Sequence, residues 1–210
     1  YRLLDLTDIK KPKYRTLTSL IKEADYYKLV EELGQKVVVK PAREGSSYGI
    51  SIVDNYSDFF DGVQKALRYD SKVVVEEYIK GIEIGCAVLE KDGELMVGEV
   101  DEVELQSGFF DFEAKYEHKG SQIHCPARIS DEISDLTKET SLRVFKLLGC
   151  RDFSRIDFFI TDDNVLYFNE INTIPGFTST SRYPGMMQEV GVSFKEVIST
   201  LIENAVNRND

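Results

Sequence analysis

Two neighbouring segments constrain the fold of this chain most strongly, because both have the composition of β-strands and only a short turn separates them. Residues 155–161 and 165–172 are rich in Phe, Ile, Val and Tyr. The turn contains Asp163-Asn164, a pair that can form the two-residue loop of a tight hairpin. The sequence therefore predicts an antiparallel hairpin in which Phe159 lies opposite Phe168.

The register of this hairpin gathers polar side chains on one face, together with that phenylalanine pair. Counting back from the two-residue loop sets Asp157 opposite Glu170. It also sets Arg155 opposite Asn172 on the same face, because side chains along a strand alternate with a period of two.

Two facing carboxylates repel each other unless a cation neutralises them. The carboxylates of Asp157 and Glu170, with the amide oxygen of Asn172, are ligands that suit Mg²⁺, which also keeps waters and binds substrate phosphates. The sequence therefore indicates a magnesium site on the hairpin. The alternative is an exposed polar hairpin tip that holds no metal.

Composition and charge exclude several classes of function. The chain has 210 residues, of which 42% are hydrophobic, so it can form one large domain or two small ones with a sizeable core. Its net charge of -11 argues against nucleic acid or an anionic membrane as a partner, because both require a basic face. An anionic substrate would therefore need locally placed cations.

The cysteines and histidines indicate neither a disulfide framework nor a zinc site. Cys86, Cys125 and Cys150 are far apart and form no Cys-x-x-Cys motif, so reduced, cytoplasmic chemistry fits best. His118 and His124 do not have the spacing of a helical metal pair. No apolar run approaches the length of a membrane span.

The pattern along the chain changes near residue 81, where mixed helices and strands give way to consecutive strands. We therefore expect one domain over residues 1–80, with a phosphate-binding flap, and a second over residues 81–210. Residues 101–120 and 173–185 are expected to be loops, and the aromatic residues of the first indicate a functional role. Helices are expected to begin after caps at Ser57, Ser130 and Ser193.

A lysine followed by a Gly/Ser-rich turn resembles a phosphate-binding flap. Lys40 ends a predicted strand, and the backbone and hydroxyl groups of Ser46 and Ser47 can donate hydrogen bonds to phosphate oxygens. The lysine lies before the glycines, so the segment is not a P-loop. An ordinary hairpin loop is the alternative.

Acidic residues flank the strand that leads to the expected boundary. Glu76, Glu77 and Ile79 lie at the strand end, whose backbone groups can bind the edge of an adenine, and the carboxylate of Glu83 can accept from ribose hydroxyls. Solvated acidic residues are the alternative.

Four blocks of this sequence, in order, resemble the D-alanine-D-alanine ligases, a family with the ATP-grasp fold. The blocks are residues 39–47, 113–116, 154–157 and 169–179. The resemblance covers nearly the whole chain and implies an α+β fold, with two lobes of mostly antiparallel sheet, flanking helices and the nucleotide held between the lobes.

The resemblance also implies a role for each matching residue. For ATP, these are Lys40 and Lys115 at the phosphates, Glu76 at the adenine amine and Glu83 at the ribose. For two Mg²⁺ ions, with Mn²⁺ as an alternative, they are Asp157, Glu170 and Asn172. For the amino acids, they are Arg155 and the Gly176 backbone at the oxyanion, and Ser181 and Arg182 at the second substrate. Ser46 and Tyr116 would help to order the first D-alanine and the lid, which is the loop expected over residues 101–120.

The implied reaction is ATP-dependent ligation of two D-amino acids for peptidoglycan precursors, through an acyl phosphate. The full-length enzyme is expected to be a homodimer. Because the chain starts at Tyr1 and matches only part of the family, we expect a fragment without the N-terminal domain, inactive alone but able to bind magnesium-nucleotide.

Two details favour D-serine over D-alanine as the second substrate. The block Ser181-Arg182-Tyr183-Pro184 resembles the vancomycin-resistance ligases, and residues 100–105 and 108–112 are similar to the D-alanine-D-serine type. Two other functions stay open: an ATP-grasp nucleotide-binding module without ligase activity, and another carboxylate-amine ligase.

Overall fold

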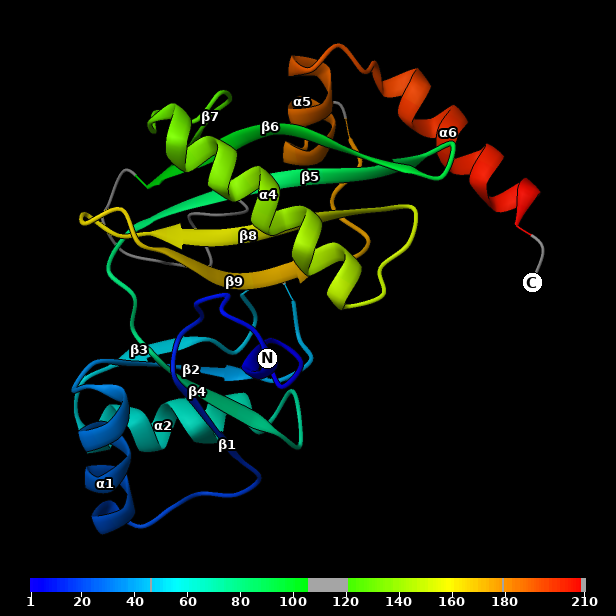
Figure 1. The fold of residues 1–210 in the computed structure, drawn as a ribbon. Coiled ribbons are helices and arrows are strands. Elements are labelled where there is room, and N and C mark those ends of the chain that lie inside the picture. Colours follow the sequence, from blue (N-terminus) through cyan, green and yellow to red (C-terminus); the bar gives the residue numbers. More distant parts are fainter. Residues whose placement is uncertain (46, 106–120, 179, 209–210) are drawn as a thin grey trace. The chain divides into compact units, whose positions relative to one another are not determined.

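The computed structural model describes residues 1–45, 47–105, 121–178 and 180–208, drawn in colour in Figure 1. These residues form two compact units. Residues 1–11, 80–105 and 121–208 make up the larger unit, and residues 12–79 make up the smaller one. The assignment of separate functions to residues 1–80 and 81–210 stays a prediction.

The smaller unit is a four-stranded antiparallel sheet with two helices on one face. The strand order is β1 (Tyr14–Leu17), β4 (Val73–Glu77), β2 (Val37–Pro41) and β3 (Ser51–Val53). Helices α1 (Glu23–Leu33) and α2 (Tyr56–Ala66) pack against the alternate valines of β2, Val37 and Val39, which are fully buried. Lys40 alternates with these valines and therefore lies on the opposite face.

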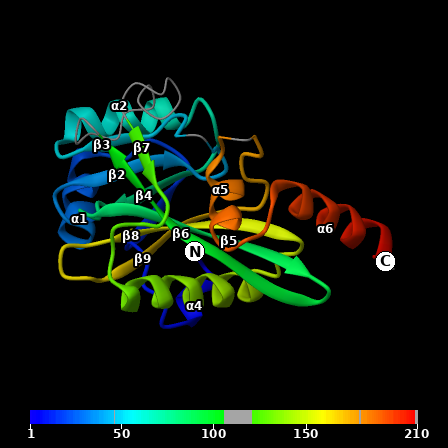
Figure 2. The same cartoon turned by 90° about the horizontal axis from the view of Figure 1, so that it is seen from above.

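The larger unit is a five-stranded antiparallel sheet. Its order is β7 (Ser121–His124), β6 (Glu94–Leu105), β5 (Ile82–Lys91), β8 (Phe153–Ile160) and β9 (Leu166–Asn172). Helix α4 (Asp131–Leu147) runs along one face, as Figure 2 shows, and packs on Cys86, Val88 and Ile156. Helix α5 (Arg182–Glu189) packs on Ala87 and Leu89 of the other face, followed by α6 (Phe194–Asn207).

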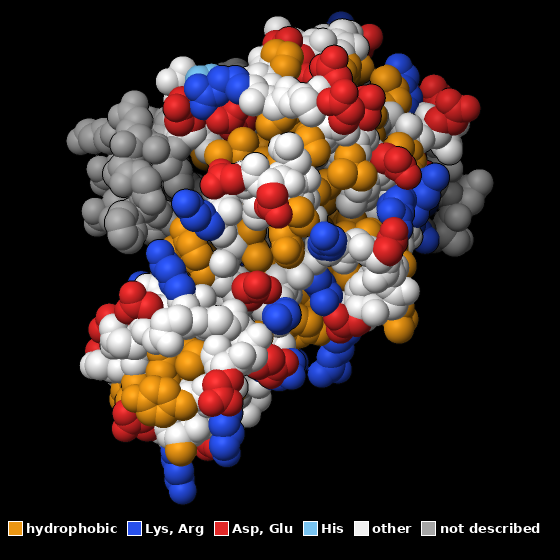
Figure 3. Space-filling view, turned by 60° about the vertical axis from the view of Figure 1, so that its left-hand side comes forward, with side chains coloured by type: hydrophobic (Ala, Val, Ile, Leu, Met, Phe, Trp, Pro, Cys, Tyr) orange, Lys and Arg blue, Asp and Glu red, His pale blue; other side chains and the backbone are white. Residues whose placement is uncertain are grey.

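Both sheets are antiparallel and both are flanked by helices, so the expected α+β fold class is confirmed. None of the helices in the described residues is both long and apolar enough to span a membrane. On the face seen in Figure 3, acidic and basic side chains are interspersed.

The hairpin of β8 and β9 has the predicted pairing at its polar end and a different pairing near its turn. Asp157 lies opposite Glu170, as predicted. The turn contains residues 162–164, because the Thr161 N–H donates to the Val165 carbonyl at 3.1 Å. Asn164 takes a positive φ of 61°, as expected for a three-residue hairpin loop.

One extra residue in β9 corrects for this longer turn. Phe158 pairs with Phe168 while Asp157 pairs with Glu170, so Asn169 forms a β-bulge. The predicted pairing of Phe159 with Phe168 is therefore wrong, and Phe168 lies in the core beneath α4. The longer loop shifts the register by one residue, and the bulge shifts it back by one. Asp157 therefore still pairs with Glu170, as predicted.

Three other predictions differ in detail. The cap of α2 is Asn55, whose side chain accepts from the Asp58 N–H, and not Ser57. Residues 101–105 continue β6 instead of starting a loop. Part of the expected loop over residues 173–185 is the helix α5, which tolerates Pro184 in its first turn because the N–H groups there have no partner within the helix. The predicted caps at Ser130 and Ser193 are confirmed.

We predict that Ser193→Ala destabilises the protein by about 1 kcal/mol, because it removes the capping box of α6. The Ser193 hydroxyl accepts from the Glu196 N–H at 3.3 Å, and the Glu196 carboxylate accepts from the Ser193 N–H at 2.8 Å. Equilibrium urea denaturation measures the change. Ser199→Ala in the middle of α6 is the control and should cause no loss, because Ala is the better helix former. Equal stability of the two variants would contradict the assignment.

Candidate functional site

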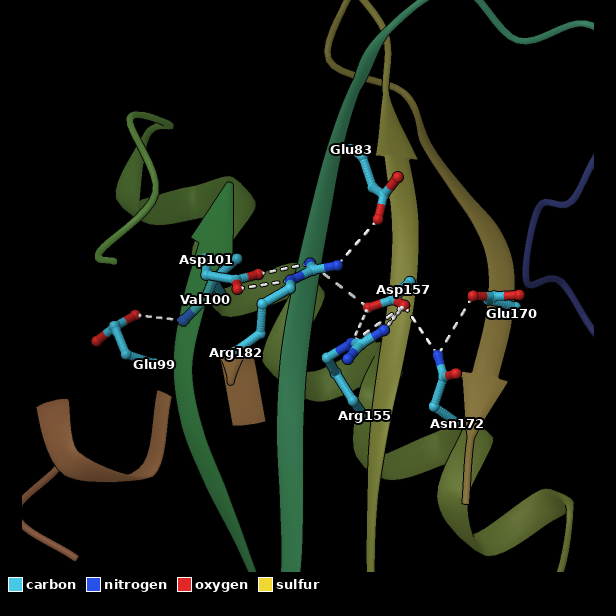
Figure 4. A network of polar contacts seen from close by, with 9 residues as sticks. All are labelled: Glu83, Glu99, Val100, Asp101, Arg155, Asp157, Glu170, Asn172 and Arg182. Carbon is cyan, nitrogen blue, oxygen red and sulfur yellow. Dashed lines mark hydrogen bonds and ion pairs between the residues drawn. The ribbon is translucent and has the colours of Figure 1, made fainter. Parts of the chain in front are cut away.

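One face of the larger sheet carries carboxylates from three of its strands (Figure 4). Asp157 on β8 lies opposite Glu170 on β9, and Gly85 on β5 lies between Asp157 and Asp101 on β6. We call Asp101, Asp157 and Glu170 the carboxylate row. The pairing of adjacent strands aligns these residues because each one faces its neighbour in register.

Asp157 lies at the centre of the polar network, and only 1% of its side chain is exposed. Arg155 binds it from the same strand, with Nε 2.8 Å from Oδ1 and Nη2 2.8 Å from Oδ2. Asn172 donates from Nδ2 to Oδ2 at 3.0 Å, and Nη2 of Arg182 lies 3.5 Å from Oδ1. The structure therefore brings the predicted Arg155, Asp157 and Asn172 into direct contact.

Arg182 reaches this network from the first turn of α5. Its Nε and Nη2 donate to the two oxygens of Asp101 at 2.8 and 2.7 Å, and its Nη1 donates to Glu83 at 2.9 Å. The side chain is 13% exposed, so the guanidinium is largely buried among carboxylates. Arg182 was expected at the second amino acid and Glu83 at the ribose; the structure places them in contact with each other.

Burial and charge shift the ionisation of these groups. Burial raises the pKa of the Asp101 carboxyl, although the neighbouring Arg182 opposes this shift. Burial opposes the charged form of Arg182, but the carboxylates of Asp157 and Asp101 overcome it and raise its pKa well above the ordinary value. Asp157 likewise raises the pKa of Arg155 against the effect of burial. Both guanidiniums are therefore firmly charged.

The hairpin residues have the chemistry of a Mg²⁺ site. The Asn172 amide nitrogen stands 3.0 Å from Asp157 Oδ2 and 3.3 Å from Glu170 Oε1, so a positively polarised group already lies between the two carboxylates. Across the described ranges, no three His, Cys, Asp or Glu side chains form a metal-binding group, so an amide would have to complete this set. Two carboxylates and one amide oxygen suit Mg²⁺ with retained waters, so Asn172 would have to turn its oxygen toward the ion in place of the nitrogen.

In the smaller unit, the structure pairs two residues predicted to bind ATP. Lys40 Nζ lies 2.8 Å from Glu76 Oε2, and the Glu76 side chain is only 5% exposed. The second oxygen of Glu76 is buried and has no hydrogen-bond partner among the described residues. An unpaired buried acceptor is costly, so this atom marks a place for a donor.

Of the other residues predicted to bind the nucleotide, Glu77, Ile79 and Ser47 belong to the smaller unit and Glu83 to the larger one. The Glu77 N–H, expected near adenine, donates to the Lys13 carbonyl at 2.9 Å, and Ile79 lies just beyond the end of β4. Ser47 has a positive φ of 60° in the loop after β2. Ser46, Lys115 and Tyr116 lie outside the described residues.

Gly176 and Ser181 lie together at the start of α5. A Cβ on Gly176 would stand 3.1 Å from the Ser181 Oγ. That hydroxyl also accepts from the Thr178 N–H at 2.9 Å, so it fixes the fold of the loop before α5. The backbone of Gly176 and the hydroxyl of Ser181 are therefore direct neighbours.

The prediction from sequence missed Asp101 as a site residue, because it assigned residues 101–120 to a loop. In the structure Asp101 is a fully buried residue inside β6. The signal was present in the sequence: if the strand from residue 94 continues, it places an aspartate in a strand interior, where a charge requires a partner.

Comparisons with known proteins agree on one family. A family model described as D-ala D-ala ligase C-terminus matches residues 3–203. A D-alanine-D-alanine ligase of Oceanobacillus iheyensis is 41% identical over 213 residues, which cover 99% of this chain and 57% of that relative. The chain therefore spans little more than half the length of this relative.

Two solved structures have the same fold. The VanG D-Ala:D-Ser ligase from Enterococcus faecalis matches with a TM-score of 0.85 at 44% identity, covering 96% of this chain and 59% of its own. A D-alanine-D-alanine ligase from Bacillus anthracis complexed with ATP matches with a TM-score of 0.79 at 26% identity, covering 98% of this chain and 64% of its own.

We predict that Asp101→Asn destabilises the protein by about 3 kcal/mol, because the buried Arg182 loses a carboxylate that it binds through two hydrogen bonds. Chemical denaturation measures the loss. Asp25→Asn is the matched control: it removes an exposed ion pair with Lys28 on α1 and should leave stability unchanged within error. Similar losses in the two variants would contradict the view that Asp101 and Arg182 form a buried, coupled pair.

Proposed function

The chain belongs to the D-alanine-D-alanine ligase family, and from this premise we propose that it carries the nucleotide and metal sites of an ATP-dependent ligase that joins D-alanine to a second D-amino acid for peptidoglycan precursors. The observation that carries the proposal is the contact of Arg155, Asp157 and Asn172 beside Glu170. Carboxylates that would bind a metal and an arginine that would bind an oxyanion are what acyl-phosphate chemistry requires.

ATP is the proposed nucleotide, and the smaller unit supplies two of its contacts. Glu76 presents a buried oxygen that has no partner within the described part of the chain, and an adenine amine would satisfy it as a hydrogen-bond donor. Lys40 is held 2.8 Å from Glu76 on the face of β2 opposite the core, and we assign it to the phosphates. The ATP complex of the Bacillus anthracis relative supports this choice of nucleotide.

Asp157, Glu170 and Asn172 are the residues that we assign to Mg²⁺. These residues would hold the ion, which would supply charge neutralisation to the phosphates of the nucleotide. Arg155 fixes the orientation of Asp157 through two of its nitrogens, Nε and Nη2. Its Nη1 takes part in neither of these bonds, and we assign it to the oxyanion that forms when the second amine attacks the activated carbonyl.

D-serine is the proposed second substrate, with D-alanine as the second candidate. The likeness to the D-Ala:D-Ser ligase from Enterococcus faecalis supports D-serine, and the D-alanine-D-alanine ligase of Oceanobacillus iheyensis, at a similar identity of 41%, supports D-alanine. The hydroxyl of Ser181 and the charged pair of Arg182 with Asp101 make this part of the site polar, which favours a substrate that carries a hydroxyl.

The choice of second substrate is tested with the full-length protein, ATP, Mg²⁺ and D-alanine, to which D-serine or further D-alanine is added. We expect dipeptide formation from both and a kcat/KM at least tenfold higher for D-serine, because the polar groups would bind its hydroxyl. Phosphate release coupled to mass detection of the product measures each rate. A preference for D-alanine would reject the serine assignment, and the absence of any dipeptide would reject ligase activity.

The metal assignment is tested by binding, independently of turnover. We predict that Glu170→Gln weakens Mg²⁺-ADP binding at least tenfold in isothermal titration, because it removes a carboxylate ligand. Binding of ADP in EDTA should change less than twofold. Glu94→Gln, at the start of β6, is the matched control and should bind like the unaltered protein. Unchanged Mg²⁺-ADP affinity in Glu170→Gln would overturn the assignment.

A further inference from the structure

Gly85 is an unusual residue for its place in the fold, since it lies inside β5, the central strand of the larger sheet. Glycine weakens a strand interior because it has no side chain to pack, and it often marks a site that another group approaches closely. On one neighbouring strand Gly85 pairs with Asp101, and on the other with Asp157. It therefore leaves the only gap in a line of acidic residues that crosses four strands.

The guanidinium of Arg182 fills this gap. A Cβ on residue 85 would stand 2.5 Å from Nη2 of Arg182, 2.7 Å from Oδ1 of Asp157 and 3.0 Å from Oδ1 of Asp101. Figure 4 shows the guanidinium lying over β5, with Asp101 on one side and Asp157 on the other. Any side chain at this position would collide with Arg182 and Asp157 and would crowd Asp101.

The positive charge of Arg182 also complements the carboxylates on either side of Gly85. Neighbouring strands are about 4.8 Å apart, so Asp101 and Asp157 on either side of β5 are about 10 Å apart at their backbones. One guanidinium above Gly85 reaches both, with Nη2 2.7 Å from Asp101 and 3.5 Å from Asp157. Without it, two carboxylates that are each about 1% exposed would lack this shared counter-ion.

We propose that Gly85 is a positioning residue for the second amino acid: by leaving this space, it seats Arg182 between Asp101 and Asp157 and so fixes one wall of the subsite. The inference rests on the proposed function, because that function assigns Arg182 to the second substrate. Packing of the sheet alone would not require a glycine at this position, whereas the guanidinium of Arg182 occupies the space that a side chain would take.

The test is a double-mutant cycle of Gly85→Ala and Arg182→Lys in the full-length protein. Lysine keeps the positive charge but has no Nη2, the atom that the new Cβ would meet most closely. Gly85→Ala alone should raise the KM for the second amino acid at least tenfold. The KM for ATP should rise by a smaller factor, because Arg155 and Asn172 still bind the other carboxylate oxygen of Asp157, Oδ2.

In the Arg182→Lys background, the same Gly85→Ala change should raise the KM for the second amino acid by a smaller factor than in the unaltered background, because the contact with Nη2 is lost and only those with Asp157 and Asp101 remain. If Gly85→Ala alone fails to fold, Arg182→Lys should restore part of the folded protein, because it removes the closest of the three contacts. An unchanged KM in Gly85→Ala, an equal rise in both backgrounds, or no restored folding would overturn the inference.

The outcome also separates the two proposals. If the unaltered protein makes no dipeptide, the proposed function fails. The denaturation midpoints of the unaltered protein, the two single variants and the double variant then test only whether Gly85 positions Arg182. A smaller loss of stability from Gly85→Ala in the Arg182→Lys background would support the position of Arg182 over Gly85, and an equal loss in both backgrounds would overturn it.

Discussion

The larger unit depends on the sharing of one buried carboxylate, that of Asp157, between two guanidiniums. Arg155 binds it from its own strand, and Arg182 approaches it from α5 while also binding Asp101 and Glu83. Removing one partner from such a cluster leaves an uncompensated charge in a poorly solvated place, which is far more costly than the loss of a surface pair. The charges therefore fix α5, β5, β6 and β8 to one another on the face opposite α4.

One face of the larger sheet carries this polar cluster, and the other face packs in the apolar core beneath α4. Regular alternation along β9 would place Phe168 and Glu170 on the same face. The bulge at Asn169 changes the alternation, so that Phe168 packs beneath α4 and Glu170 joins the carboxylate row. The position of Glu170 in the site therefore depends on the β-bulge as well as on the identity of the residue.

The polar end of the hairpin was predictable because pairing and alternation are local properties. The pairs of Asp157 with Glu170 and of Arg155 with Asn172 are confirmed. The turn was predicted one residue too short, since Asn164 tolerates the positive φ of a three-residue loop, and the bulge compensated by chance. Helix α5 was missed because Pro184 and Gly185 are poor helix formers, yet packing of Tyr183 and Met186 holds the segment helical.

The sequence by itself determined the antiparallel strands, the helix caps at Ser130 and Ser193, and the polar set on the hairpin, because each depends on residues close together in the chain. Only the tertiary structure decided that Arg182 lies over Gly85 and binds Asp101, 81 residues away, and that Lys40 pairs with Glu76. These contacts arise from the order of strands in the sheets and from the need to neutralise buried charge. No local pattern encodes either of them.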